Sequence, residues 1–199
     1  MNAGAERWFL ALWPDPEVRA TLAEGCRPLL PKGARGTHAQ DLHLTLRFLG
    51  PLDPEALARV EAAADSVTGL SPVPLCIDRL GHFPRSRILW AGPSVPGAGL
   101  LGLVARLEEA LSARGFIPEE RPFRAHITLA RKVWRPPRMA WGAPVPWLAR
   151  DLVLAAGQEG TVPRYRVRRS WTLTRPLDPP LDPRSLCTEA SRGPGPARS

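Results

Sequence analysis

Cysteine is scarce in this sequence of 199 residues, and its spacing excludes several kinds of site. The three residues, Cys26, Cys76 and Cys187, are an odd number and lie far apart, so we expect neither a disulfide framework nor a paired-cysteine metal site. No apolar run approaches the length of a membrane span, and residues 1–6 lack the apolar core of a signal peptide. We therefore expect a cytoplasmic protein in a reducing compartment, with no membrane partner.

Two patterns that bind common cofactors are also missing. The sequence contains no Gly-x-x-x-x-Gly-Lys stretch, so it has no P-loop for ATP. No cysteine or acidic residue adjoins the two histidine motifs described below at the spacing of zinc ligands. We expect no metal and no other cofactor.

Lysine is nearly absent, although the chain is strongly basic. Its 27 Lys and Arg residues exceed its 19 Asp and Glu residues, which gives a formal net charge of +8 and a sequence pI of about 10.8. Lysine occurs only at positions 32 and 132, so almost all of the positive charge is arginine, which is suited to bidentate phosphate contacts. A polyanionic partner explains this excess, and the arginine-rich codon usage of a GC-rich genome explains it equally well.

Two of the four histidines begin the same short pattern. It reads His43-Leu44-Thr45-Leu46 at the first site and His126-Ile127-Thr128-Leu129 at the second. At average composition, the chance that two of four histidines do so is on the order of one in ten thousand. Because side chains alternate along a strand, the His and the Thr of each copy share one face. Each copy therefore predicts an imidazole beside a hydroxyl on one face of a strand, with apolar side chains on the opposite face.

The order of hydrophobic patterns predicts an α+β fold. Each motif strand follows a helix, which indicates a diverged duplication. We therefore expect a bilobal fold, with two pseudo-symmetric lobes of antiparallel sheet plus helices around a central cleft. The domain is expected to span 1–175, and the Pro/Gly/Arg-rich segment 176–199 is expected to be disordered. The expected strands lie at 7–13, 42–49, 72–80, 87–91, 123–131, 151–155 and 165–174. Helices are expected after Asp15, ending at 31–33, after Asp53, and near 100–114, and the Pro-, Trp- and Arg-rich segment 132–149 is expected to be an irregular connection.

Two imidazoles that face each other across a cleft are suited to opening a phosphodiester with water. The ordinary pKa of histidine allows it to act as a general base or a general acid near neutral pH. One imidazole would activate the water and the other would protonate the leaving oxygen. The near symmetry of the motifs does not decide which of His43 and His126 has which role.

Polar neighbours of the histidines are candidates for holding the phosphate. We expect Thr45 and Thr128 to donate hydrogen bonds to the phosphate oxygens, bonds that strengthen as negative charge builds there. Arg47 shares the face of the first motif, so it is a further candidate for phosphate binding. Arg131 has the opposite strand parity to His126, so it reaches the cleft only at the end of its strand or through a bulge.

In their longer form these motifs resemble the two-histidine (2H) phosphoesterase superfamily, and in particular its RNA 2',3'-cyclic phosphodiesterase branch, historically called 2'-5' RNA ligase. The resemblance covers about residues 7–175. Ala125 stands where the family usually has proline, while the motif histidines and threonines are intact. The similarity rests on Arg7-Trp-Phe-Leu-Ala-Leu, His43-Leu-Thr-Leu-Arg-Phe-Leu-Gly50, Gly81-His-Phe-Pro84 with Ile88-Leu-Trp90, and Arg121-Pro-Phe-Arg-Ala-His-Ile-Thr-Leu-Ala-Arg131.

The resemblance implies hydrolysis of a terminal RNA 2',3'-cyclic phosphate to a 2'-phosphomonoester, without a metal. It implies that His43 is the proton donor and that His126 is the proton acceptor that activates water. Thr45, Thr128 and Arg131 would then hold the phosphate. The expected partner is RNA with a 2',3'-cyclic phosphate end, such as a tRNA fragment or a short oligonucleotide, and the protein is expected to be a monomer.

The part of the site that would bind the remaining RNA is open to two interpretations. Phe48, together with Phe123 and Trp90, is a candidate for stacking on a base, although aromatic side chains near strands more often belong to the core. Arginines near the C-terminus either extend a phosphate-binding surface or protect the edge of a sheet. These arginines are residues 164, 166, 168, 169 and 175.

Two alternatives to this activity remain. The first is a 2'-5' RNA ligase or another phosphodiesterase, acting on a 2'-5' bond or a cyclic nucleotide, because such enzymes share the motifs. The second is a non-catalytic RNA-binding module that uses the basic surface alone. The presence of both histidines and both threonines argues against the second, because binding needs neither a proton donor nor a proton acceptor.

Overall fold

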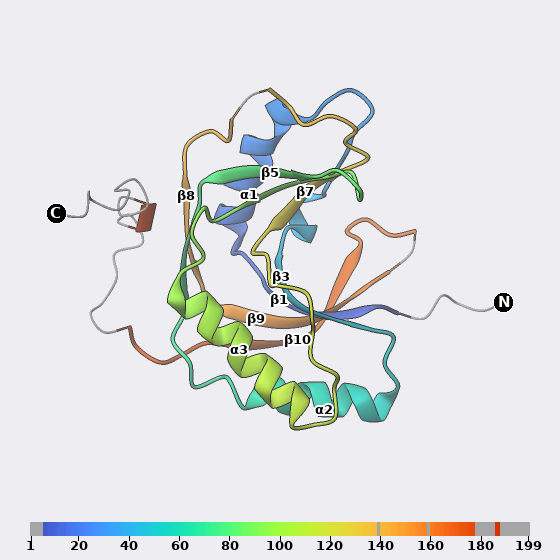
Figure 1. Cartoon of the computed structure of the whole chain (residues 1–199), viewed down its shortest axis with the longest axis vertical. Coiled ribbons are helices and arrows are strands. Elements are labelled where there is room, and N and C mark those ends of the chain that lie inside the picture. The colour runs from blue at the N-terminus through green and yellow to red at the C-terminus, as the bar shows by residue number, and fades with distance from the viewer. Residues whose placement is uncertain (1–5, 139, 159, 178–185, 188–199) are drawn as a thin grey trace.

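One large antiparallel sheet dominates the molecule, as the computed structural model of the chain shows (Figure 1). The structure describes residues 6–138, 140–158, 160–177 and 186–187. The predicted α+β class, with mostly antiparallel strands and few helices, is confirmed. No helix among these residues is long and apolar enough to cross a lipid bilayer.

The elements follow one another in mixed order. The α-helices are α1 (Pro16–Cys26), α2 (Pro54–Asp65) and α3 (Ala98–Ser112), with short 3-10 turns η1 (Arg27–Leu29) and η2 (Ala39–Asp41). The strands are β1 (Trp8–Leu12), β2 (Arg35–Gly36), β3 (Leu44–Gly50), β4 (Val73–Ile77), β5 (Arg79–Phe83), β6 (Ile88–Gly92), β7 (Ile127–Arg131), β8 (Val145–Ala149), β9 (Asp151–Gly157) and β10 (Tyr165–Thr172).

Two helices begin where the sequence predicts, for the same local reason. The carboxylate of Asp15 accepts a hydrogen bond from the backbone N–H of Val18 at 2.9 Å, and that of Asp53 accepts one from Ala56 at 2.7 Å. Each aspartate is followed by a proline at the first helical position, where the missing N–H costs nothing. These caps fix the starts of α1 and α2.

The two motif strands are neighbours in the centre of the sheet. The strand order is β10-β9-β1-β3-β7-β6-β5, with β2 also paired to β7. Strand β1 pairs with β9 along its whole length, whereas β3 and β7 pair only at Leu44 and Ile127 within the described residues. The motif strands were expected to face each other across a cleft, and they instead lie side by side in one sheet, touching at this pair.

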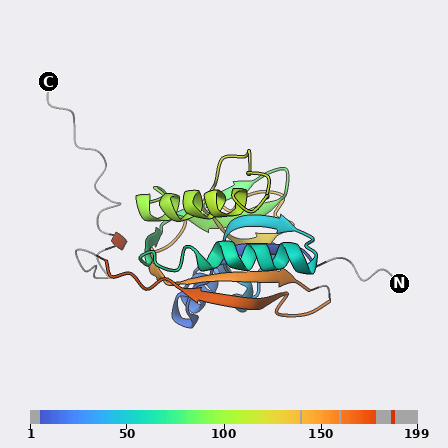
Figure 2. The same ribbon diagram turned by 90° about the horizontal axis from the view of Figure 1, so that it is seen from below.

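The helices lie at opposite ends of the molecule (Figure 1). Helices α2 and α3 lie side by side at one end, as the view in Figure 2 also shows, and α1 lies at the other end. Strands β4 and β8 form a separate two-stranded sheet. The core between these layers contains fully buried aliphatic side chains from β1, β3, α3 and β9, including Leu10, Leu12, Leu44, Leu103 and Leu152.

A bulge in β7 changes which face its last residues occupy. Trp90 of β6 pairs with Thr128, but the preceding Leu89 pairs with Ala130, so Leu129 is an extra residue. Leu129 and Ala130 are both buried, whereas strict alternation would expose one of them. Arg131 is consequently exposed on the same face as Thr128. A bulge was one of the two ways in which the sequence allowed Arg131 to reach the site.

Several element boundaries differ from the sequence expectations. The second motif strand was expected from residue 123, but β7 begins only at Ile127. The first helix was expected to end at 31–33, and it ends at Cys26, where a 3-10 turn continues the chain. The connection expected to be irregular at 132–149 contains β8, and the short strand β2 was not predicted.

The expectation that the cysteines form no disulfide is wrong. Cys76 of β4 is bonded to Cys187, with a Cα–Cα distance of 5.2 Å. The odd cysteine is Cys26, which is free and buried, and burial raises the pKa of its thiol to about 11. Most of the segment predicted to be disordered, 178–185 and 188–199, lies outside the described residues.

Candidate active site

Each motif histidine stands immediately before its strand and is held by the same backbone contact. The Nδ1 of His43 lies 2.7 Å from the carbonyl oxygen of Asp41, and the Nδ1 of His126 lies 2.7 Å from that of Arg124. Because a carbonyl oxygen only accepts, Nδ1 must carry the proton in both rings. The Nε2 of each neutral imidazole is therefore left with a free lone pair, which is the arrangement that a proton acceptor requires.

Aromatic rings enclose His43 on three sides. Trp13 stacks almost parallel to the imidazole at 5.1 Å, Phe9 stacks at 4.8 Å, and the ring of Tyr165 meets it edge-on at 4.9 Å. Burial among these rings disfavours the charged imidazolium and lowers the pKa of His43 to about 4, although the nearby carbonyl and carboxylate of Asp41 oppose this change. His43 is therefore neutral in the free protein at pH 7.

His126 lies in a similar but more open setting. Phe83 meets its ring edge-on at 5.1 Å, and Trp90 lies at 6.3 Å. Burial lowers the pKa of His126 below its ordinary value, and the positive charge of Arg131 acts in the same direction. Both imidazoles therefore favour the neutral form until an anion binds beside them.

Two pockets share the residues of the motifs. The first has a volume of about 610 Å³ and contains His43 of the first motif together with Thr128 of the second. The second has a volume of about 380 Å³ and contains Thr45 of the first motif together with His126 of the second. The four motif side chains thus form one site where β3 meets β7, with a pocket on either side.

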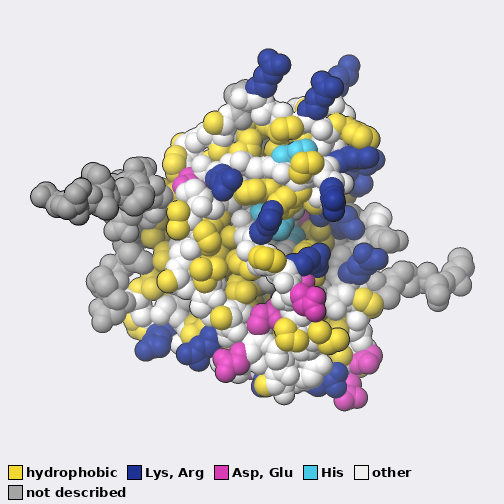
Figure 3. All heavy atoms as spheres, in the orientation of Figure 1, with side chains coloured by type: hydrophobic (Ala, Val, Ile, Leu, Met, Phe, Trp, Pro, Cys, Tyr) yellow, Lys and Arg dark blue, Asp and Glu magenta, His cyan; other side chains and the backbone are white. Residues whose placement is uncertain are grey.

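The first pocket is rich in arginine. Its lining includes Arg131, Arg35 and Arg164, and the first two come from residues that pair in the β2–β7 ladder. Of the residues expected to bind phosphate, the structure therefore brings Thr128 and Arg131 into one pocket with His43. Figure 3 shows Lys and Arg side chains gathered around the histidines, with Asp and Glu farther down the same face.

Asp41 is a site residue to which the sequence assigned no role. Its side chain is 5% exposed, and its carboxylate accepts the backbone N–H groups of Arg164 and Tyr165 at 2.9–3.0 Å. Its own carbonyl oxygen holds His43. Asp41 therefore joins the turn before β3 to the start of β10 and fixes the edge-on contact between Tyr165 and His43. In the sequence, the only indication that Asp41 belongs to the site was its position two residues before His43.

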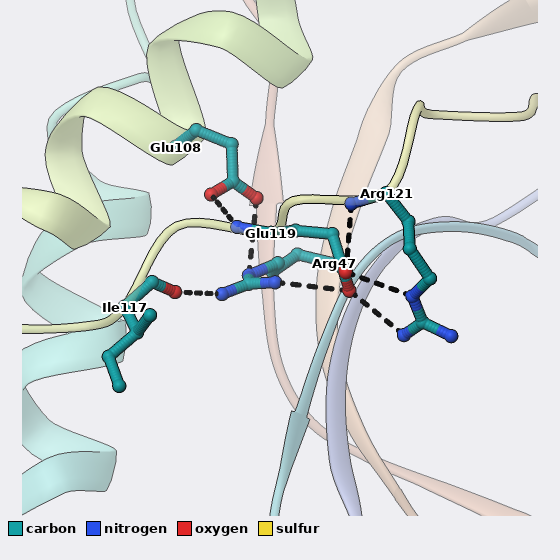
Figure 4. Close-up of polar contacts among 5 residues, drawn as sticks. All are labelled: Arg47, Glu108, Ile117, Glu119 and Arg121. Atoms are coloured by element: carbon teal, nitrogen blue, oxygen red, sulfur yellow. Dashed lines mark hydrogen bonds and ion pairs between the residues drawn. The ribbon is translucent and has the colours of Figure 1, made fainter.

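Arg47 has a different environment from the one expected of a phosphate-binding residue. Its guanidinium forms ion pairs with Glu108 at 3.1 Å and Glu119 at 3.4 Å, and it donates a hydrogen bond to the carbonyl oxygen of Ile117 (Figure 4). The side chain is only 11% exposed. The geometry does not support the expectation that Arg47 binds phosphate, because its charge is already balanced by two carboxylates.

The aromatic candidates for base stacking divide into two kinds. Phe48 is 60% exposed and lines the second pocket, so it remains a candidate. Trp90 is half-buried and covers Gly81, where an added Cβ would lie 2.0 Å from the indole ring. Trp90 is therefore a packing residue that requires glycine opposite it.

The C-terminal arginines are mostly used within the fold. Arg168 forms an ion pair with Glu61, and Arg169 forms one with Asp65, which ties β10 to α2. Arg166 pairs in the same way with Glu6. These contacts favour the interpretation that the arginines protect a sheet edge, and only Arg164 of this group lines the first pocket. No group of three His, Cys, Asp or Glu side chains suited to a metal occurs in the described part of the chain.

Comparison with known proteins places the chain among RNA-processing enzymes. Residues 14–156 match the family model of the 2'-5' RNA ligase superfamily. The RNA 2',3'-cyclic phosphodiesterase of Escherichia coli is 33% identical over 179 residues, which cover 85% of this chain and 98% of that protein. The protein of the same name from Thermus thermophilus is 34% identical over 142 residues, covering 67% of this chain and 72% of that protein.

Solved structures agree with this result. The crystal structure of Escherichia coli LigT complexed with ATP matches with a TM-score of 0.74 and 26% identity, and covers 85% of this chain and 98% of that one. The same protein complexed with 3'-AMP matches with a TM-score of 0.72 and 28% identity, over 85% of this chain and 99% of that one.

Proposed function

This chain belongs to the 2'-5' RNA ligase superfamily, and we propose that it hydrolyses a 2',3'-cyclic phosphate at the end of an RNA to a 2'-phosphomonoester. The observation that carries the proposal is the pair of histidines whose Nδ1 atoms are held by matching carbonyl contacts where the two motif strands meet. Curated relatives with the name of this activity, in bacteria and archaea, support it.

In the proposed reaction the histidines move two protons. His126 takes a proton from water through Nε2, and the water oxygen forms a bond to phosphorus. The bond between phosphorus and the 3' oxygen breaks, and His43 donates a proton from Nε2 to that oxygen, so the phosphate remains on the 2' oxygen. Exchange with solvent then returns each imidazole to its starting state.

A donor role for His43 depends on the substrate. Burial keeps this imidazole neutral in the free protein, whereas a donor must be protonated. A bound phosphodiester carries a negative charge, which raises the pKa of an adjacent imidazole. In this proposal the anionic substrate itself supplies the interaction that charges His43, so the acid form exists chiefly in the complex.

The phosphate oxygens are held by Thr45, Thr128 and Arg131 in this proposal. The hydroxyls of the two threonines donate hydrogen bonds, and the guanidinium of Arg131 supplies positive charge, as negative charge builds on the non-bridging oxygens. Phe48 at the rim of the second pocket stacks on a base. The protein acts as a cytoplasmic monomer on tRNA fragments or short oligonucleotides, without a metal or another cofactor, as the sequence predicts.

The test is hydrolysis of a dinucleotide that ends in a 2',3'-cyclic phosphate, with EDTA present. We expect the wild type to produce a 2'-phosphate, identified by NMR, and we expect His43→Ala and His126→Ala each to lower the rate about a hundredfold or more. Thr21→Ala, in α1 and outside the motifs, is the control and should keep the wild-type rate. Loss of wild-type activity on adding EDTA, or unchanged rates in both histidine variants, would overturn the proposal.

The family name favours one further assay. If a 5'-hydroxyl RNA end replaces water as the attacking group, the bond between phosphorus and the 3' oxygen breaks in the same way. The phosphate then joins the two RNAs through a 2'-5' bond instead of ending as a 2'-phosphomonoester. Ligation products should therefore be sought at high concentrations of a 5'-hydroxyl RNA. Binding of RNA without any turnover, unaffected by either histidine variant, would instead identify a non-catalytic RNA-binding module.

A further inference from the structure

Two segments beside β7 build a surface that the proposed reaction does not use. One is the turn 84–87 between β5 and β6, and the other is the segment 132–138 that follows β7. We call them together the Trp134 surface. Because β7 lies between β3 and β6 in the sheet, this surface lies on the side of the site away from β3.

Specific contacts hold the two segments together. The backbone N–H of Val133 donates a hydrogen bond to the carbonyl oxygen of Arg87 at 3.0 Å, and Nε2 of His82 lies 2.9 Å from the carbonyl oxygen of Val133. Val133 itself is fully buried. The side chains on either side of it are therefore presented outward from an anchored backbone.

An exposed tryptophan is paired with an arginine at the centre of this surface. The guanidinium of Arg87 lies 3.3 Å from the centre of the Trp134 ring, a close cation–π contact. Trp134 is nevertheless 70% exposed. An indole that packs on no core and is oriented by an arginine has the geometry of a stacking platform for a flat partner.

The backbone of both segments adopts a conformation that costs energy. Arg87 has φ of 55° and Lys132 has φ of 60°, and they are the only residues other than glycine with positive φ in the described part of the chain. Left-handed backbone in residues other than glycine persists where surrounding structure imposes it, and such residues cluster at functional sites. Here both of them shape one surface.

The charge of this surface is of one sign. The exposed cationic residues are Arg85, Arg87, Lys132, Arg135 and Arg138. No Asp or Glu occurs at positions 79–107 or 121–150, and within the described residues none of these five side chains forms an ion pair. Arg47, Arg168 and Arg169, by contrast, are all paired. Unpaired arginines without neighbouring carboxylates favour a polyanion.

The surface continues directly from the first pocket. Arg131 lines that pocket with His43 and Thr128, and it is the last residue of β7, immediately before the segment that contains Trp134. An RNA that ends in a cyclic phosphate has all its other nucleotides on the 5' side, so a strand leaving the pocket past Arg131 meets this surface next.

We propose that the Trp134 surface binds the RNA strand on the 5' side of the terminal nucleotide, with Trp134 stacking on a base and the surrounding cations contacting phosphates. The inference rests on the proposed function and deepens it. Binding at this surface makes the enzyme more efficient on an oligonucleotide than on a mononucleotide. The side chains of this surface take no part in the chemical step.

The test compares two substrates that share the same reacting group. One is adenosine 2',3'-cyclic phosphate, and the other is an RNA of about ten nucleotides with the same end, long enough to cover a single-strand binding groove. We expect Trp134→Ala, and the double variant Arg85→Glu with Arg135→Glu, to raise KM for the RNA about tenfold without changing kcat. Activity on the mononucleotide should not change, and Trp134→Phe should restore most of the binding.

The control variant is Arg106→Glu, which makes one such charge reversal on the exposed face of α3, away from this surface, and is compared with each single reversal, Arg85→Glu and Arg135→Glu. The salt dependence of RNA binding should become shallower in the double variant, by about 0.7 in the logarithmic slope per lost phosphate contact. Equal effects on both substrates, or equal effects of Arg106→Glu, would overturn the proposal. Anisotropy of a labelled RNA with a plain 3' end measures the same binding without catalysis, so failure of the proposed reaction is distinguished from failure of this surface.

Discussion

The carboxylate of Asp41 accepts the backbone N–H of Tyr165 at 3.0 Å, although 124 positions separate these residues in the chain. Tyr165 in turn packs edge-on against His43, whose Nδ1 is held by the carbonyl oxygen of Asp41. One buried residue thus fixes both the imidazole and a wall of its enclosure. Several measurable consequences follow from this arrangement and its neighbours.

Asp41→Asn should reduce both stability and activity. An amide offers one oxygen where the carboxylate offers two to the N–H groups of Arg164 and Tyr165, so the free energy of unfolding should fall by about 1–3 kcal/mol. The rate should fall because Tyr165 no longer fixes His43, and KM should change little. Urea unfolding and steady-state kinetics measure the two effects. Asp15→Ala is the control: losing that helix cap costs about 1 kcal/mol and should leave the rate unchanged.

The stability of the protein should fall on acidification through the titration of His43. Its pKa is about 4 when folded, against an ordinary value of 6.5, so the unfolded chain binds more protons in between. Stability therefore rises with pH from about 4 to 6.5, by at most about 3 kcal/mol from this group. His43→Gln should flatten that part of the curve of unfolding free energy against pH. Wild-type and variant curves that stay parallel across this interval would contradict the assignment.

Arg47→Met should destabilise the fold without weakening phosphate binding. The variant removes the cation that pairs with Glu108 and one of the two that pair with Glu119, which keeps Arg121, so the free energy of unfolding should fall. The pKa of Glu119, which hydrogen bonds from Arg121 chiefly hold at about 2, should rise only slightly, because the charge of Arg47 makes the smallest contribution to lowering it. Thermal unfolding and NMR titration measure these changes. Arg59→Met breaks an exposed pair with Glu55 and should cost no more than about 0.5 kcal/mol.

Arg131→Met should show the opposite pattern. Its side chain is exposed in the first pocket, so unfolding should be unaffected within about 0.5 kcal/mol. If it stabilises charge on the phosphate, kcat/KM should fall about a hundredfold. Inhibition by inorganic phosphate should weaken in parallel. A variant with normal kcat/KM and lowered stability would place Arg131 with the structural arginines instead.

The disulfide predicts a specific pattern of cysteine reactivity. In unreduced protein unfolded in denaturant, alkylation should label only Cys26, because Cys76 and Cys187 are bonded to each other. Digestion without reductant should give one cross-linked peptide pair by mass spectrometry. Labelling of all three thiols in protein purified without reductant would contradict the bond.

The sequence predicted best where one local signal was sufficient. Asp15 and Asp53 each precede a proline, and both helices begin there because capping involves only a few neighbouring residues. The repeated motif likewise predicted that His43 and His126 belong to one site, since two copies of a rare pattern indicate a shared site, although the motif strands were expected to face each other and instead pair in one sheet.

The sequence failed where a residue's role is decided by distant partners. Alternation along the strand predicted that Arg47 shares the face of His43, but the pairing of β3 with β1 leaves Leu46 as an extra residue, which interrupts that alternation. The two carboxylates that pair with Arg47 come from α3 and the segment that follows it. The Cys76–Cys187 bond joins positions 111 residues apart, and cysteine counting argued against it. The bulge that turns Arg131 toward the pocket was one of two allowed alternatives, and only pairing with β6 distinguishes them.

The single residue pair between β3 and β7 has a mechanical consequence. The other strand pairs of this sheet extend over two to seven residue pairs in the described part of the chain, but here the pairing is reduced to Leu44 and Ile127. This line therefore has the least backbone pairing in the described part of the sheet, and the two motif histidines precede the two strands that meet there. An anion bound by both His43 and His126 connects the two strands across this line. The proposed complex is therefore more rigid than the free protein at the place where backbone hydrogen bonds between strands are fewest.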